Sequence, residues 1–137
     1  MNSSRLILLP GLDGTGDLFA PLLAVIPRNL SARVIAYPCE RRLSYDELFG
    51  LIENQLAAEN NVILLAESFS GPLALRYASI HPERVQAVIL CASSIQSPMP
   101  KWLGIFARQA VFHLPLPAIV LRHLLVGPER RLNLCGW

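Results

Sequence analysis

The sequence predicts an α/β fold in which helices flank a parallel sheet, and three observations support this prediction. Short apolar runs alternate with amphipathic stretches along the chain. The connections between successive runs are about 20 residues long, which suits right-handed crossovers between parallel strands. The run from Val62 to Ala66 contains no polar residue, as is typical of strands that are buried on both faces.

The first two predicted strands are Arg5–Leu9 and Arg33–Tyr37, and a proline follows and ends each of them. Residues 17–26 lie between them and predict an amphipathic helix. Three apolar side chains define one face of this helix: Leu18, Leu22 and Val25.

A capping-box pattern marks the start of the next helix. Ser44 is a suitable N-cap residue, and Glu47 follows three residues later. Apolar residues at helical spacing then form one stripe: Tyr45, Leu48, Phe49, Ile52 and Leu56. Beyond this helix we expect a strand at 62–66, a helix at about 70–79 and a strand at 85–91.

The segment after the strand at 62–66 is the strongest candidate for catalytic chemistry. Ser68 lies in the run AESFSG, a variant of the G-x-S-x-G nucleophile elbow in which Ala66 and Ser70 replace the two glycines. Small residues at these positions permit a tight strand-to-helix turn, so Ser68 would project its hydroxyl from the carboxyl end of the sheet. On this motif alone, simple capping of a helix by Ser68 and Ser70 is an equally good interpretation.

The loop at residues 10–16 favours the catalytic interpretation. Its sequence, PGLDGTG, joins the first predicted strand to the first predicted helix. Gly11 and Gly14 would let the main chain turn an N–H group toward a substrate instead of into a sheet ladder. A phosphate-binding loop is the competing interpretation, but the G-K-[S/T] ending and the G-x-G-x-x-G spacing are both missing.

The segments LILLPGLDGTGDLFAPL, VILLAESFSGPLALRYA and HPERVQAVILCAS together resemble the N-terminal half of an α/β-hydrolase-fold protein of the bacterial serine hydrolase type. The resemblance covers about residues 5–97. It implies that Ser68 is the catalytic nucleophile and that the backbone N–H groups of Leu12 and Phe69 form the oxyanion hole. The residues that would support the elbow and the loop are Gly11, Gly14, Ala66, Glu67, Ser70 and Gly71.

This chain departs from the family pattern at two places. Pro10-Gly11 replaces the His-Gly that is common in the first loop, and Glu67 stands where His or Gln is frequent beside the nucleophile. These departures concern the substrate class and leave the expected fold unchanged.

The resemblance also predicts how the chain is divided. Residues 1–97 would form the N-terminal part of the hydrolase core, residues 98–126 a helical lid segment, and residues 127–137 an irregular tail. Four apolar side chains of the lid fit either an acyl pocket or the packing of the lid itself. They are Trp102, Leu103, Phe106 and Phe112.

A serine nucleophile needs a base, and in this fold an acid and then a histidine follow the serine along the chain. No aspartate follows Ser68, and Glu83 and Glu129 are the later glutamates. We expect His81 roughly 15–18 Å from Ser68, at the far end of the helix after the elbow. We therefore expect a fragment that ends before the triad acid and base.

Composition excludes several other classes. The chain has 137 residues, of which 53% are hydrophobic and 16% charged, so it is not intrinsically disordered. A net charge of +2 with a single lysine, Lys101, gives no basic surface for nucleic acid. Charged residues and prolines interrupt the apolar stretch at 102–126, so we expect no membrane-spanning segment. The N-terminal apolar run at residues 6–9 is too short for a signal peptide.

The three cysteines, Cys39, Cys91 and Cys135, form no CxxC pair and are odd in number. They are therefore interpreted as ordinary thiols of a protein in the reducing cytoplasm, with no metal site.

The sequence thus predicts a hydrolase of ester, thioester or amide bonds that acts through an acyl-enzyme on Ser68, with weak or no activity in this chain. It implies a hydrophobic small-molecule acyl substrate and no cofactor. Two alternatives remain open. One is a non-catalytic module that binds an acyl chain or a partner strand. The other is a non-hydrolytic enzyme of the same fold, such as a lyase or an acyltransferase.

Overall fold

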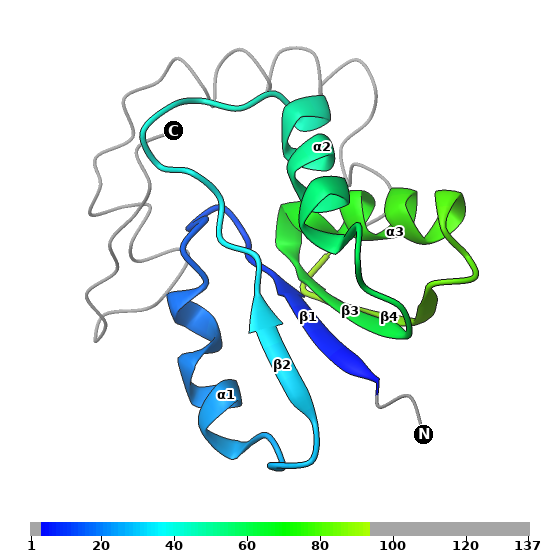
Figure 1. Cartoon of the computed structure of the whole chain (residues 1–137). Helices are drawn as coiled ribbons and strands as arrows, with labels where there is room; N and C mark the ends of the chain where they lie inside the picture. The colour runs from blue at the N-terminus through cyan, green and yellow to red at the C-terminus, as the bar shows by residue number, and fades with distance from the viewer. Residues whose placement is uncertain (1–3, 94–137) are drawn as a thin grey trace. The chain divides into compact units, whose positions relative to one another are not determined.

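The computed structural model describes residues 4–93, which contain four parallel strands and the helices that connect them (Figure 1). The sheet has the order β2-β1-β3-β4. Its strands are β1 (Arg5–Leu9), β2 (Ser31–Val34), β3 (Val62–Glu67) and β4 (Val85–Cys91). The predicted α/β class with a parallel sheet flanked by helices is confirmed.

Three α-helices connect the strands. They are α1 (Ala20–Val25), α2 (Tyr45–Leu56) and α3 (Gly71–Ile80). A short 3-10 turn precedes α1 at Asp17–Phe19, and another precedes α3 at Ser68–Ser70. The predicted lid segment and tail lie outside the described residues.

The two faces of the sheet have separate hydrophobic cores. Alternate side chains of β1 point to opposite faces, as strand geometry requires. Ile7 and Leu9 pack with residues of α2 and α3, whereas Leu6 and Leu8 pack with Phe19 and Leu65 on the other face. Helices α2 and α3 thus cover one face together, and α1 lies apart from them (Figure 1). On the second face the cover among the buried residues is Phe19 of the 3-10 turn, and the expectation of strands buried on both faces holds for β1 and β3.

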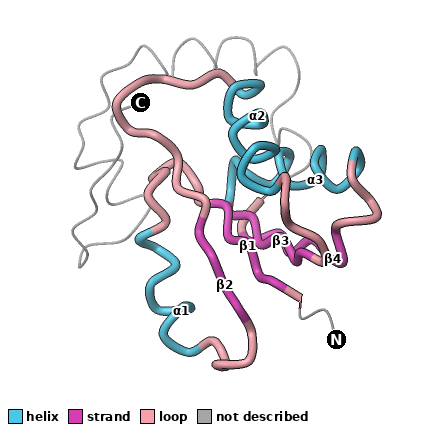
Figure 2. Tube along the Cα trace, viewed as in Figure 1, coloured by secondary structure: helices cyan, strands magenta, loops and turns pink. Residues whose placement is uncertain are grey.

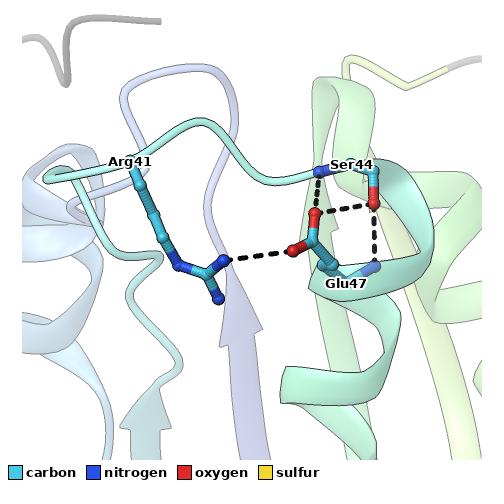
Figure 3. Close-up of polar contacts among 3 residues, drawn as sticks. All are labelled: Arg41, Ser44 and Glu47. Atoms are coloured by element: carbon cyan, nitrogen blue, oxygen red, sulfur yellow. Dashed lines mark hydrogen bonds and ion pairs between the residues drawn. The ribbon is translucent and has the colours of Figure 1, made fainter.

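Helix α2 begins with the predicted capping box (Figure 3). The backbone N–H of Glu47 donates to the Ser44 hydroxyl oxygen at 3.3 Å, and the Ser44 N–H donates to the Glu47 carboxylate at 2.8 Å. Arg41 approaches the other carboxylate oxygen at 3.1 Å. These bonds satisfy backbone donors that the first turn of a helix otherwise leaves unpaired.

The second strand differs from the prediction. It begins at Ser31 and ends at Val34, so residues 35–37 leave the sheet. The Ile35 N–H still bonds to the Leu8 carbonyl, but the Tyr37 N–H donates to the Gly14 carbonyl at 2.8 Å. The strand therefore ends before Pro38, because Tyr37 bonds to the loop after β1 instead of to a neighbouring strand.

The first helix is also shorter than predicted, and its apolar face is exposed. Leu22 is 37% exposed and Val25 is 74% exposed, and no residue of α1 is buried. The periodicity located a helix here, but it wrongly implied that this face packs against the sheet. Only Phe19, in the preceding 3-10 turn, is buried.

Cys39 is disulfide-bonded, so the expectation of three ordinary thiols is wrong at this position. Cys91 is a free thiol. Within residues 4–93, none of the helices has the length and apolar character that a membrane crossing requires.

Candidate functional site

The candidate site lies at the carboxyl ends of the two central strands, β1 and β3. The chain continues from β1 to β2 on one side and later returns to β3 on the other side of β1, so the strand order reverses between β1 and β3 (Figure 2). In open α/β sheets, such a reversal leaves a crevice where ligands bind. Leu9 pairs with Ala66 in the register of β1 and β3. The loop at 10–16 and the turn at 67–70 are therefore neighbours.

Ser68 has the strained backbone that a nucleophile elbow requires. Its φ angle is +51°, in the left-handed region that residues other than glycine rarely adopt. Glu67 before it is extended, and α3 begins three residues later at Gly71. Strand, left-handed residue and helix thus follow each other within a few residues, and Ser68 is partly exposed at the turn. Such strain is characteristic of functional sites.

The loop after β1 lies against this turn. A Cβ atom on Gly11 would lie 3.5 Å from the Ser68 Cβ and 3.4 Å from the carboxyl carbon of Glu67. The site residues predicted from the two loops are therefore close in space: Gly11 from the first loop, and Glu67 and Ser68 from the elbow.

The loop itself is ordered by the buried side chain of Asp13. One carboxylate oxygen accepts hydrogen bonds from the Thr15 hydroxyl at 2.9 Å and from the Gly16 N–H at 3.0 Å. Asp13 is 3% exposed, and its other oxygen has no hydrogen-bond partner among the described residues. Gly14 has a φ of +67° and Gly16 a φ of +81°, so both glycines supply backbone conformations that other residues adopt only with strain.

Glu67 lies beside the candidate nucleophile in an environment that favours its neutral form. Burial raises the pKa of the Glu67 carboxyl, and the negative charge of Asp13 raises it further. A hydrogen bond from the Gly11 N–H acts in the opposite direction and is the weakest of the three effects.

Two tyrosines that lie outside the sequence motifs contact the elbow. The Tyr45 hydroxyl donates to the Phe69 carbonyl at 2.6 Å, and its ring meets the Phe69 ring edge-on at 6.2 Å. The Tyr37 ring meets Phe69 from another element at 5.9 Å. The sequence pattern places Tyr45 only in the apolar stripe of α2, and Tyr37 only in a strand. Neither residue belongs to a local motif that would have indicated this role.

Of the remaining predicted residues, Leu12 is 41% exposed in the first loop, and Ala66 is fully buried at the end of β3. Ser70 is also fully buried and contacts both Tyr37 and the first loop. Gly71 lies so close to Ser93 that a Cβ atom on it would be 1.8 Å from the Ser93 hydroxyl oxygen.

His81 is the histidine of the described segment, and it is not a base for Ser68. Its Nε2 lies 3.3 Å from a carboxylate oxygen of Glu53 on α2, and its ring lies tilted at 44° against the Tyr77 ring, with the centroids 4.7 Å apart. Helix α3 has ten residues, so about 15 Å separates its two ends. No group of three or more potential metal ligands comes together within residues 4–93.

Comparison with solved structures identifies the fold. The chain is similar to a monoacylglycerol lipase from Paleococcus ferrophilus, with a TM-score of 0.63 and 17% identity, over 89% of this chain and 58% of the lipase chain. It is also similar to an extracellular α/β-hydrolase from a Paenibacillus species, with a TM-score of 0.56 and 13% identity, over 88% and 58% of the two chains.

The fold is therefore that of part of an α/β-hydrolase, as the sequence motifs predicted. The chain spans 58% of the length of each of these two structures. No protein-family model and no curated protein matches the sequence.

Proposed function

We propose that the site is an acyl-transfer site of the serine hydrolase type, with Ser68 as its nucleophile. The observation that carries this proposal is the left-handed φ of +51° at Ser68, on the turn between β3 and α3. A serine that merely capped a helix would have an extended backbone at the N-cap, as Ser44 has before α2. The left-handed backbone of Ser68 therefore favours the role of nucleophile over the role of helix cap.

The proposed reaction begins with attack of the Ser68 Oγ on the carbonyl carbon of an ester, thioester or amide. The Oγ–C bond forms, the bond to the leaving group breaks, and the hydroxyl proton passes through a base to the leaving group. Water then hydrolyses the acyl-enzyme and restores the serine. We assign the oxyanion donors to the backbone N–H groups of Leu12 and Phe69, because one follows β1 beside the elbow and the other directly follows Ser68.

The positive end of the α3 dipole would add to the stabilisation of the oxyanion, because the helix begins only three residues after Ser68. For the substrate we propose a hydrophobic acyl group. The side chains of Leu12 and Tyr45, 41% and 42% exposed, present apolar surface on the first loop and at the start of α2. The similarity in fold to a lipase agrees with this substrate class.

Labelling of the 137-residue chain with a fluorophosphonate tests the proposal. This reagent phosphonylates an activated serine: the Oγ–P bond forms and the P–F bond breaks, with loss of HF. We expect the label on Ser68 by peptide mapping, its loss in Ser68→Ala, and its retention in Ser79→Ala, which changes an exposed serine of α3. The labelling should be slow, because residues 4–93 place no histidine beside Ser68, and absence of the label in the wild-type chain even after prolonged reaction would contradict the proposal. Absence of labelling together with saturable binding of a fluorescent fatty acid would support a non-catalytic acyl-binding module instead.

A further inference from the structure

We propose that Ser70 and Tyr37 are positioning residues that hold the loop at 10–14 against the turn carrying Ser68. The catalytic meaning of this role rests on the function proposed above, whereas the positioning itself can be tested separately. Nothing in the elbow motif requires a hydroxyl at position 70, where the common pattern has a glycine.

The hydrogen bonds of Ser70 have only one possible direction. The Ser70 Oγ bonds to the carbonyl oxygen of Pro10 and lies 2.7 Å from the Tyr37 hydroxyl. A carbonyl oxygen can only accept, so the single hydroxyl proton of Ser70 must go to Pro10. Tyr37 must then donate its own proton to the Ser70 Oγ. The result is a directed chain from Tyr37 through Ser70 to Pro10.

Tyr37 also holds the other end of the same loop. Its backbone N–H donates to the Gly14 carbonyl at 2.8 Å, and the Gly14 N–H donates to the Gly11 carbonyl at 3.1 Å. The segment from Pro10 to Gly14 is therefore attached at both ends to one pair of contacting residues, at Pro10 through the Ser70 side chain and at Gly14 through the Tyr37 backbone. Leu12, the proposed oxyanion donor of this loop, lies at the middle of the attached segment.

Because both residues are buried, these hydrogen bonds are costly to break. Ser70 is 0% exposed and Tyr37 is 3% exposed, so water does not replace a lost partner at low cost. Burial also raises the pKa of the Tyr37 hydroxyl, which keeps the donor proton in place at ordinary pH. Ser70 is separated from Ser68 by one residue in the elbow. A shift of the loop is therefore resisted directly at the turn that carries the candidate nucleophile.

The variants Tyr37→Phe and Ser70→Ala test this role in the full chain, with Ser79→Ala as the matched control. Tyr37→Phe keeps the ring and its contact with Phe69 and removes only the hydroxyl. Two properties are measured: amide hydrogen exchange of residues 11–14 by NMR, and the rate of fluorophosphonate labelling of Ser68. We expect each variant to speed exchange in the loop by about tenfold, the effect of losing one buried hydrogen bond. Amide exchange in α2 should not change in either variant. In the control Ser79→Ala, both the loop exchange and the labelling rate should equal those of the wild type.

Labelling of Ser68 should slow about tenfold in both variants, and the double variant should be no slower than Ser70→Ala, because the two hydroxyls act in one chain. Unchanged loop exchange in Tyr37→Phe would overturn the proposal, whether or not Ser70→Ala folds. Faster loop exchange with an unchanged labelling rate would overturn the link to catalysis. If wild-type Ser68 is not labelled, the proposed function fails, and loop exchange alone then supports or overturns the positioning role.

Discussion

Gly71 lies directly against Ser93, at the point where the elbow helix passes the end of β4. A Cβ atom on Gly71 would be 1.8 Å from the Ser93 hydroxyl oxygen and 2.8 Å from the Ser93 Cβ. The φ of Gly71 is −55°, an ordinary helical value that any residue can adopt. The glycine is therefore required for space and not for backbone conformation. It lets α3 start beside the strand that follows it.

Gly71→Ala should destabilise the protein, although alanine is the better helix former. We expect a loss of about 1–3 kcal/mol in the free energy of unfolding, because the added methyl group overpacks a closed contact. Gly50→Ala is the matched control in α2, where a Cβ atom would meet nothing within 4 Å. That variant should gain up to about 1 kcal/mol from helix propensity. Urea unfolding of both variants gives the two values, and equal effects at the two positions would contradict the proposed crowding.

Ser68→Gly should relieve strain at the elbow. The left-handed conformation costs a non-glycine residue about 1–2 kcal/mol, whereas the added flexibility of glycine costs about 0.5–1 kcal/mol. We therefore expect Ser68→Gly to leave the free energy of unfolding unchanged or to raise it by up to about 1.5 kcal/mol. Ser79→Gly, in the last turn of α3 with no left-handed backbone, should instead lower it by up to about 0.5 kcal/mol. A loss of stability in Ser68→Gly as large as that in Ser79→Gly would show that position 68 is not strained.

The capping box of α2 should make stability depend on pH through Glu47. Hydrogen bonds from the Ser44 backbone and side chain lower the pKa of the Glu47 carboxyl. A lowered pKa in the folded state means that this contribution is present above the unfolded pKa, about 4.3, and is lost as the pH falls below it. Glu47→Gln should therefore reduce the midpoint of thermal unfolding at pH 7 but have less effect at pH 3.

Ser44→Ala removes the other half of the box and should cost about 1 kcal/mol of stability at pH 7. Because the Ser44 bonds are the main cause of the lowered pKa of Glu47, the Glu47→Gln effect should shrink in the Ser44→Ala background. Thermal unfolding of the two single variants and the double variant checks this coupling. Strict additivity of the two changes would contradict it.

Elements with strong local signals could be predicted from the sequence, and elements shaped by distant contacts could not. The cap at Ser44 and the run at 85–91 gave the start of α2 and the bounds of β4 correctly. The end of β2 was missed because the Tyr37 N–H bonds to Gly14, which no local pattern records. The apolar periodicity of α1 located the helix but not its burial.

The same distinction applies to the candidate site. Ser68 and Gly11 could be selected because the steric demands of a tight turn leave a motif in neighbouring residues. Tyr37 and Tyr45 could not be selected, because they reach the elbow from other elements and act through a hydroxyl at the end of a long side chain. Local spacing identifies the turn, but only the fold shows which side chains hold it.

Glu67 should oppose the effect of Glu47 on pH-dependent stability. Burial, and then the charge of Asp13, raise the pKa of the Glu67 carboxyl. A carboxyl with a raised pKa in the folded state stabilises the protein at low pH, and this stabilisation is lost as the pH rises from the unfolded value, about 4.3, through the folded value. At neutral pH the folded protein must therefore hold a partly buried carboxylate beside Asp13.

Glu67→Gln removes that charge and keeps a side-chain oxygen that can accept the Gly11 N–H. We expect Glu67→Gln to unfold at a higher temperature than the wild type at pH 7.5 and at nearly the same temperature at pH 3.5. Thermal unfolding measured between these two pH values checks the trend, with Glu83→Gln as a control at an exposed carboxylate. If the unfolding temperature of Glu67→Gln instead fell relative to that of the wild type as the pH rises, the raised pKa of Glu67 would be contradicted. The ionised carboxylate would then stabilise the folded protein.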